Sequence, residues 1–262
     1  MSPPVGKAGS HLRGLILPGV LTLIALAVLV SLGNWQVRRL ASKEDLISRT
    51  AERPKAAPLD FRGRDIGDVG EVAAFLGANE YRPVLLTGGY QPAGEVRVFT
   101  SLSDPKTGPH GGPGFWILTP LATEPAGTAI YVNRGFVPQE RSDAYSPPPA
   151  DRVTIKGLLR APEPGSRFTP APELQRRVFY ARDPVRMAEA TGLAGGAVAF
   201  SIDLDASETP ASGLPQAGET IMTFTNNHLQ YAVTWYGLGL ALLAVFAIYA
   251  RGQLVKRDKK PA

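Results

Sequence analysis

Cysteine is absent from the 262 residues of this chain, and its absence narrows the chemistry that the chain can perform. Without a thiol the chain has no disulfide, no thiolate nucleophile, no cysteine-ligated zinc and no iron–sulfur cluster. The three histidines lie far apart in the sequence, so we expect no histidine-based metal cluster. A metal ion in this protein would be held by histidine or by oxygen ligands.

Common catalytic and nucleotide-binding signatures are also missing. The sequence has no G-x-S-x-G elbow, no G-x-x-x-x-G-K-[ST] phosphate loop, no H-E-x-x-H zinc helix and no G-x-G-x-x-G after a predicted strand. The glycine-rich segment around His110 lacks the spacing of a phosphate loop, and we interpret it as a turn. We therefore expect a protein that is not an enzyme; a membrane-bound enzyme that uses Asp or Glu is the alternative.

Charged residues are missing from a long segment near the start of the chain. No charge occurs from Gly14 to Val37, and Leu15 to Leu32 consists mostly of Leu, Ile, Val and Ala. At 1.5 Å per residue this run is long enough for a hydrocarbon core of about 30 Å. It exceeds the roughly 7 to 15 apolar residues of a signal peptide, and no A-x-A cleavage site follows it. We therefore expect a transmembrane helix at 14–34 rather than a cleaved signal.

A second charge-free segment extends from Thr220 to Ala250, and its apolar part begins at Tyr231. We expect the second transmembrane helix at 228–250. No Lys or Arg occurs between Gly213 and Gln230, whereas basic residues follow the span at Arg251, Lys256, Arg257, Lys259 and Lys260. Cytoplasmic flanks of membrane helices favour Lys and Arg, so this asymmetry places the C-terminus in the cytoplasm.

The first span gives a weaker signal for orientation. Basic residues beyond it outnumber Lys7 and Arg13 before it, which by itself favours the opposite orientation; they are Arg38, Arg39, Lys43 and Arg49. We follow the second span because its asymmetry is larger. Two spans then place both termini in the cytoplasm. Few residues precede Leu15, so we expect no organelle transit peptide, and we expect the bacterial inner membrane as the location.

The predicted organisation follows from these spans. It comprises a cytoplasmic N-terminus at 1–13, a transmembrane helix at 14–34, a periplasmic α+β domain with a helical stalk at 35–227, a second transmembrane helix at 228–250 and a basic cytoplasmic tail at 251–262. The net charge of +5 comes largely from the basic clusters beside the spans. Anionic membrane lipid explains such clusters, so we expect lipid contact and no nucleic-acid partner.

The segment between the spans is typical of one β-rich domain. Helix-forming residues continue from Trp35 to Arg53, which predicts a helical stalk that ends at Pro54. Helices are also predicted at Asp68–Leu76 and at Asp183–Gly192, each with an aspartate N-cap. β-Branched and aromatic runs predict strands at Tyr81–Tyr90, Glu95–Leu102, Gly114–Thr123, Thr128–Val137, Val153–Leu159 and Val198–Leu204. The expected fold class is an α+β membrane protein, with two transmembrane helices flanking one mostly antiparallel β-rich periplasmic domain.

His228 has the most informative position of the three histidines. It precedes Tyr231 by three residues and Trp235 by seven, on one helical face that leads into the second span. Asn226 or Asn227 is available as the N-cap of that helix. Aromatic residues at this depth commonly form an interfacial belt, so membrane anchoring is one interpretation of this face.

Haem binding is the other interpretation. A neutral imidazole at the membrane edge can ligate haem iron, and the haem propionates favour cationic partners. Arg38 and Arg39 lie about one turn beyond the first span, at a depth similar to that of His228. Gly237 and Ala241 form a small-xxx-small pair, which predicts close packing of the second span against the first.

Several short motifs, in the same order along nearly the whole chain, resemble those of the surfeit locus protein 1 family. They are Gly33-Asn34-Trp35-Gln36, Arg39-Leu40, Lys43 through Ile47, Gly114 through Pro120, Val132 through Pro138, Gly157 through Arg160, Phe179 through Asp183, and Asn226 through Ala232 followed by Trp235. Each motif alone is weak, whereas the ordered set is specific. The family often has tryptophan at three positions where this chain has Ser42, Phe136 and Phe179, so any stalk contact made at position 42 in relatives is in doubt here.

The resemblance implies an assembly factor, or chaperone, for haem–copper cytochrome c oxidase. It implies that the oxidase catalytic subunit and other assembly factors are partners. For bacterial members it also implies haem a binding, with the histidine that matches His228 as the iron ligand. The arginines are our own expected propionate partners. The expected cofactor site comprises His228 on the haem iron with Trp35, Arg38, Arg39, Arg134, Tyr231 and Trp235 around it.

The alternative function is a membrane-anchored scaffold that binds oxidase subunits or assembly factors without binding haem. Its interaction surface would lie on the β domain, for example around Asn133-Arg134-Gly135. In that case His228 would be dispensable.

Overall fold

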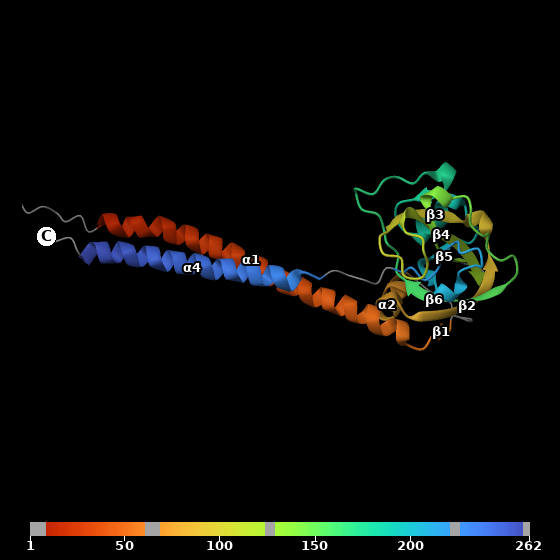
Figure 1. Ribbon diagram of the computed structural model, residues 1–262, viewed down its shortest axis with the longest axis horizontal. Helices are drawn as coiled ribbons and strands as arrows, with labels where there is room; N and C mark the ends of the chain where they lie inside the picture. Colours follow the sequence, from red (N-terminus) through yellow and green to blue (C-terminus); the bar gives the residue numbers. More distant parts are fainter. Residues whose placement is uncertain (1–8, 61–68, 124–128, 221–225, 259–262) are drawn as a thin grey trace, which may run out of the picture. The chain divides into compact units, whose positions relative to one another are not determined.

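The computed structural model describes residues 9–60, 69–123, 129–220 and 226–258 (Figure 1). The chain separates into two compact units. A helical unit combines Met1–Ser48 with Thr223–Ala262, and a β domain comprises Arg49–Met222.

The helical unit consists of α1 (Gly9–Glu52) and α4 (His228–Asp258), which lie side by side in antiparallel orientation (Figure 1). The C-terminal half of α4 contacts the N-terminal part of α1, since a Cβ added at Gly19 would lie 3.5 Å from the Phe246 ring. By length and composition both helices can cross a membrane, with mean hydropathies of 2.7 and 1.8 in their most apolar windows. Large apolar side chains such as Leu23 and Ile248 are exposed on this unit, which favours a lipid environment.

The two helices pack through a different set of small residues from the predicted one. Gly237 has no neighbouring atom within 4 Å of a built Cβ, and both it and Ala241 are exposed. The buried glycines Gly33 and Gly239 lie at the contact instead. The prediction that the spans pair was right. The prediction that Gly237 and Ala241 mediate the pairing was wrong, because the face of α4 that meets α1 carries Gly239, and Gly237 and Ala241 lie outside that face.

The predicted stalk is confirmed as helix. α1 continues without interruption to Glu52 and is followed by a 3-10 turn, η1 (Arg53–Lys55), that contains Pro54. Proline lacks the backbone N–H that the next helical turn needs, which explains the helix end. Ser42 is exposed, and its hydroxyl donates to the Arg38 carbonyl at 3.1 Å.

The β domain follows the stalk in a strand-rich order. Its strands and helices are β1 (Leu59–Asp60), α2 (Val69–Asn79), β2 (Pro83–Tyr90), β3 (Val96–Leu102), β4 (Gly112–Thr123), β5 (Ala129–Pro138), β6 (Val153–Arg160), β7 (Val178–Phe179), α3 (Pro184–Thr191) and β8 (Ala197–Leu204). Short 3-10 turns lie at η2 (Pro92–Gly94), η3 (Gln139–Arg141), η4 (Leu174–Arg176) and η5 (Ala206–Glu208).

Five of these strands close into a barrel. The hydrogen-bonded order β2, β6, β8, β5, β4 returns to its start because the end of β4 pairs with the end of β2, with Gly88 opposite Thr123 and Tyr90 opposite Leu121. β3 pairs with the first half of β4, β7 extends β3, and β1 lies beside β2. The pairs β1–β2, β3–β7 and β5–β8 are parallel and the others are antiparallel, so the expectation of a mostly antiparallel domain is confirmed.

The predicted elements agree with these bounds to within about three residues. The helix α3 has both expected caps, because Asp183 accepts from the Arg186 backbone N–H at 3.3 Å and Gly192 takes a left-handed φ of +66°. The expected N-cap Asp68 lies outside the described residues, as does Thr128. The two-residue strands β1 and β7 were not predicted, since they are too short for a hydrophobic pattern.

The barrel interior holds the main hydrophobic core. Leu121, Ile130, Leu159 and Ile202 point inward from four strands and are at most 2% exposed, and α2 covers this core with Val72. A second cluster packs α3 against the outer face of the sheet, through Met187, Val98, Leu118 and Tyr131. The strand β5 lies between these two hydrophobic clusters, because it contributes Ile130 to the first cluster and Tyr131 to the second.

All of β5 is buried, which corrects one expectation. Asn133 and Arg134 are each only 5% exposed, and the backbone of Gly135 lies against Gln216. The segment around Asn133-Arg134-Gly135 is therefore not a surface on which a partner protein docks. The sequence did not predict the burial of this segment, because its polar side chains bond to residues that are distant in the sequence: Asn133 to Asp203 and Arg134 to Glu95.

Candidate functional site at the start of the second apolar helix

The start of α4 is fixed by the two asparagines that precede it. The Asn226 side chain accepts from the His228 backbone N–H at 3.4 Å, and the Asn227 carbonyl accepts from the Tyr231 N–H at 3.2 Å. These bonds satisfy N–H groups that the first helical turn leaves without a helical partner. The caps therefore set His228 as the first residue of the helix, as the sequence predicted.

The His228 ring faces α1. Its Nδ1 lies 2.7 Å from Oε1 of Gln36, and Gln36 is only 8% exposed. An amide oxygen accepts hydrogen bonds and does not donate them, so this contact assigns the ring proton to Nδ1. In the neutral ring the other nitrogen, Nε2, then carries a lone pair, and no residue within the described ranges bonds to it.

An aromatic ring and a cation adjoin this imidazole on α1. The Trp35 indole lies edge-on to the His228 ring, with 6.5 Å between centroids and an interplanar angle of 85°. The Arg39 guanidinium lies 5.8 Å from the Trp35 ring centroid, a cation–π distance. Arg38 and Arg39 are exposed, and neither has a carboxylate partner among the residues that the structure describes. The sequence pattern did not place Gln36 in this site, although Gln36 lies in the Gly33-Asn34-Trp35-Gln36 motif.

The remaining predicted residues on α4 differ in their surroundings. Tyr231 is 54% exposed, as expected of an interfacial anchor. The indole N–H of Trp235 is buried and has no hydrogen-bond partner in the described part of the chain. Two residues before Gln36 on α1, the Asn34 side chain accepts a hydrogen bond from the Tyr236 hydroxyl at 2.7 Å, which holds the two helices together beside the site.

Arg134 has a different environment from the other predicted residues. It lies in the β domain, where its guanidinium contacts Glu95 at 3.2 Å and donates to the Ser146 carbonyl at 2.6 Å. Glu95 also accepts from the Tyr145 hydroxyl at 2.8 Å. Burial raises the pKa of Tyr145 to about 12, and the Glu95 carboxylate acts in the same direction. These contacts give Arg134 an internal structural role.

A second buried ionic cluster joins three of the family-like motifs. The Asp203 carboxylate contacts Arg182 at 2.8 Å and Arg160 at 3.5 Å, and it accepts from Asn133 at 3.0 Å and from Thr220 at 3.0 Å. Burial alone would raise the pKa of Asp203, but the two arginines outweigh it and lower that pKa. The motif residues Asn133, Arg160 and Arg182 therefore stabilise the barrel.

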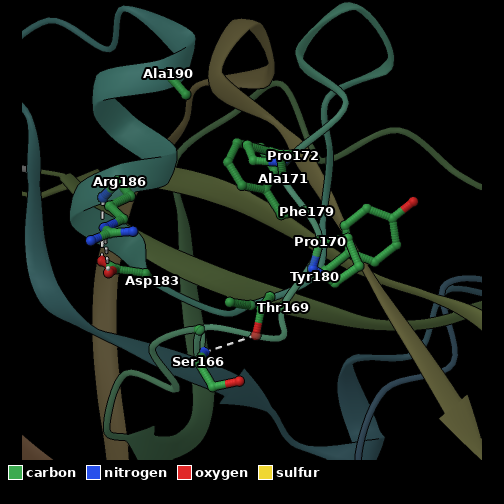
Figure 2. Close-up of a pocket in the computed structure, with 12 residues that line it drawn as sticks. Ser166, Thr169, Pro170, Ala171, Pro172, Phe179, Tyr180, Asp183, Arg186 and Ala190 are labelled. Carbon is green, nitrogen blue, oxygen red and sulfur yellow. Dashed lines mark hydrogen bonds and ion pairs between the residues drawn. The ribbon is translucent and has the colours of Figure 1, made fainter.

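The β domain also contains small pockets. One has a volume of about 250 Å³ and lies between the 165–172 segment, β7 and the start of α3. Figure 2 shows Asp183 and Arg186 facing each other at one side of it and Phe179 with Tyr180 at the other. A second, of about 210 Å³, includes Tyr90 and several prolines. Both are smaller than the roughly 300 to 1,000 Å³ of typical ligand pockets, so neither suits a porphyrin.

The donor set beside His228 fits a haem. It offers one imidazole nitrogen with a lone pair, an adjoining indole for an apolar macrocycle, and two exposed guanidiniums for propionates. The orphaned Trp235 N–H on the same helix is a further polar atom without a protein partner in the described ranges.

Known proteins resemble this chain along most of its length. The model of the SURF1 family matches residues 23–240, a range that contains the whole α1–α4 contact around His228. Surfeit locus protein 1 of Xenopus tropicalis is 30% identical over 246 residues, 89% of this chain and 76% of the relative. Surfeit locus protein 1 of Gallus gallus is 32% identical over 79% of this chain and 67% of the relative, and that of Homo sapiens 32% over 80% and 70%. The chain that carries the paired apolar helices and the closed barrel thus belongs to the SURF1 family.

Proposed function

We propose that this chain is a membrane-anchored, non-enzymatic assembly factor for haem–copper cytochrome c oxidase, and that it holds haem a through Nε2 of His228. The Gln36–His228 contact carries the proposal, because it leaves the outer nitrogen of a fixed imidazole open for a ligand. Membership of the SURF1 family supports the oxidase-related role.

Each residue of the helical unit has a distinct task in this proposal. His228 supplies the single protein nitrogen that binds the iron, and Trp35 flanks the imidazole. Arg38 and Arg39 balance the negative charge of the propionates. Haem a, when bound, supplies the iron, two propionates and a long isoprenoid tail. The exposed apolar side chains of α1 and α4 keep that tail in a lipid-like environment. Arg134 is left out, because its guanidinium already bonds to Glu95 and Ser146.

A carrier must release its cargo, and the site is consistent with release. One protein ligand on an exposed helix pair binds more weakly than an enclosed site with two ligands, and weaker binding speeds dissociation. We further propose that the protein lies in a bacterial inner membrane, with both termini in the cytoplasm and the β domain in the periplasm. The oxidase catalytic subunit and other assembly factors are the proposed partners, with lipid around the helices.

A spectroscopic comparison tests the haem part of the proposal. The full chain is purified in detergent with haem a supplied, and the Soret band of wild type is compared with that of His228→Ala. We expect loss or a marked shift of the bound-haem band. His110→Ala is the control, since His110 belongs to the β domain and bonds to Gln216 through its backbone N–H and carbonyl. Identical spectra for wild type and His228→Ala remove His228 as the ligand.

Oxidase assembly in cells distinguishes the scaffold alternative. If His228→Ala supports normal amounts of haem-loaded oxidase, the chain acts as a scaffold without haem. If His228→Ala lowers haem-loaded oxidase while the variant accumulates to wild-type levels, the carrier function is supported.

A further inference from the structure

We infer that Gln36 is the positioning residue of His228: it holds the imidazole in the Nδ1–H tautomer and so makes Nε2 the nitrogen available to a metal. The inference rests on the proposed function only for the identity of the metal group. The tautomer itself is a property of the protein without any ligand.

The contact joins residues that are 192 positions apart in the sequence, at a short distance of 2.7 Å. Gln36 is almost fully buried and lies on the face of α1 that meets α4, so water competes poorly for its amide. The Trp35 indole contacts the same ring edge-on. Two consecutive residues of α1 therefore restrict both the proton position and the orientation of the imidazole.

The orientation of the Gln36 amide decides the chemistry. With Oε1 toward the ring, Nδ1 must donate, and Nε2 keeps its lone pair. With the amide reversed, the NH₂ group would donate to Nδ1, the ring proton would move to Nε2, and that nitrogen would be blocked as a ligand. The observed Oε1 contact is the arrangement in which a metal can bind.

A neutral amide also suits a carrier better than a carboxylate does. A hydrogen-bond acceptor on the second ring nitrogen raises the basicity of the ligating nitrogen, and a carboxylate does so more strongly than an amide. Gln36 therefore orients the ring and gives only a modest increase in its affinity for iron. Gln36→Glu should tighten binding, and Gln36→Ala should weaken it.

The first test uses the full chain without haem, labelled with ¹⁵N-histidine in detergent micelles. At a pH where the ring is neutral, we expect His228 of wild type to carry its proton on Nδ1. In Gln36→Ala we expect a shift toward the Nε2–H tautomer. Gln230→Ala is the matched control, because Gln230 is an exposed glutamine two residues from His228. An Nε2–H tautomer in wild type, or no change in Gln36→Ala, overturns the inference.

The second test titrates haem a into the same proteins and measures its dissociation constant and midpoint potential. Loss of such a second hydrogen-bond partner typically weakens metal binding by roughly 10- to 100-fold, and we expect that range for Gln36→Ala. Gln36→Glu should lower the midpoint potential and slow haem release. Unchanged affinity and potential in both variants contradict Gln36 as the positioning residue, even where wild type binds haem. If wild type binds no haem while Gln36→Ala still changes the tautomer, the proposed function fails and the positioning role stands.

Discussion

Gly33 on α1 lies directly against the ring of Tyr236 on α4. A Cβ at position 33 would lie 2.7 Å from the Tyr236 Cε1 atom, so only glycine permits this approach. The Tyr236 hydroxyl then donates to the neighbouring Asn34 at 2.7 Å. The glycine, the ring and the amide thus set the separation of the two helices beside the Gln36–His228 contact.

Gly33→Ala should therefore disturb the helix pair. The added methyl group forces the Tyr236 ring away and strains the bond to Asn34, and overpacking of this kind costs about 1 to 3 kcal/mol. We expect weaker haem a binding and an altered His228 tautomer. Gly237→Ala is the control, since Gly237 is exposed with open space around its Cα. Equal effects from both variants would show that Gly33 has no special packing role.

Asp203→Asn should destabilise the β domain without affecting haem binding. The change keeps the shape but removes the most buried of the carboxylates that pair with Arg182 and Arg160, and breaking a buried ion pair costs about 3 to 5 kcal/mol. Urea unfolding followed by Trp116 fluorescence measures the loss. Asp205→Asn is the matched control, because its ion pair with Lys156 is exposed and worth about 1 kcal/mol or less.

The same carboxylate predicts how stability depends on pH. The pKa of Asp203 in the folded protein lies below its ordinary value of 3.8, so folding favours the ionised form. Its contribution to the free energy of unfolding is complete above pH 3.8 and is lost as the pH falls from there through the lowered folded pKa. Urea unfolding at a series of acidic pH values should show a shallower loss of stability in Asp203→Asn. A variant curve parallel to that of wild type would contradict this assignment.

The sequence predicted elements whose signals are local. Asp183, Pro184 and Gly192 carry the caps of α3 within ten residues, and each longer strand is bounded by Gly, Pro or Asp. The strand spacing is typical of an antiparallel sheet or of a barrel, and the sequence could not decide between them, because the pairing of Gly88 with Thr123 depends on the register of distant strands. The same holds for the parallel pair of β5 and β8.

The candidate site was predictable in its composition but not in its contacts. The position of His228 at the head of an apolar helix follows from the charge pattern and the preceding asparagines. Its bond to Gln36 depends on how two helices meet, and helix periodicity does not fix that register. The burial of Arg134 was missed for a related reason, since its partner Glu95 lies on the loop before β3.

Arg134→Leu provides a test that separates structural from cofactor roles. Removal of the Arg134 guanidinium leaves the largely buried Glu95 carboxylate without a cationic partner. We therefore expect the β domain to lose about 3 kcal/mol of stability. Arg97→Ala is the control, because its partner Asp143 is 85% exposed and the pair contributes about 1 kcal/mol or less. Haem a titration of folded Arg134→Leu should give the wild-type dissociation constant. A large loss of haem affinity, at a temperature where the variant remains folded, would instead make Arg134 a propionate partner and return it to the cofactor site.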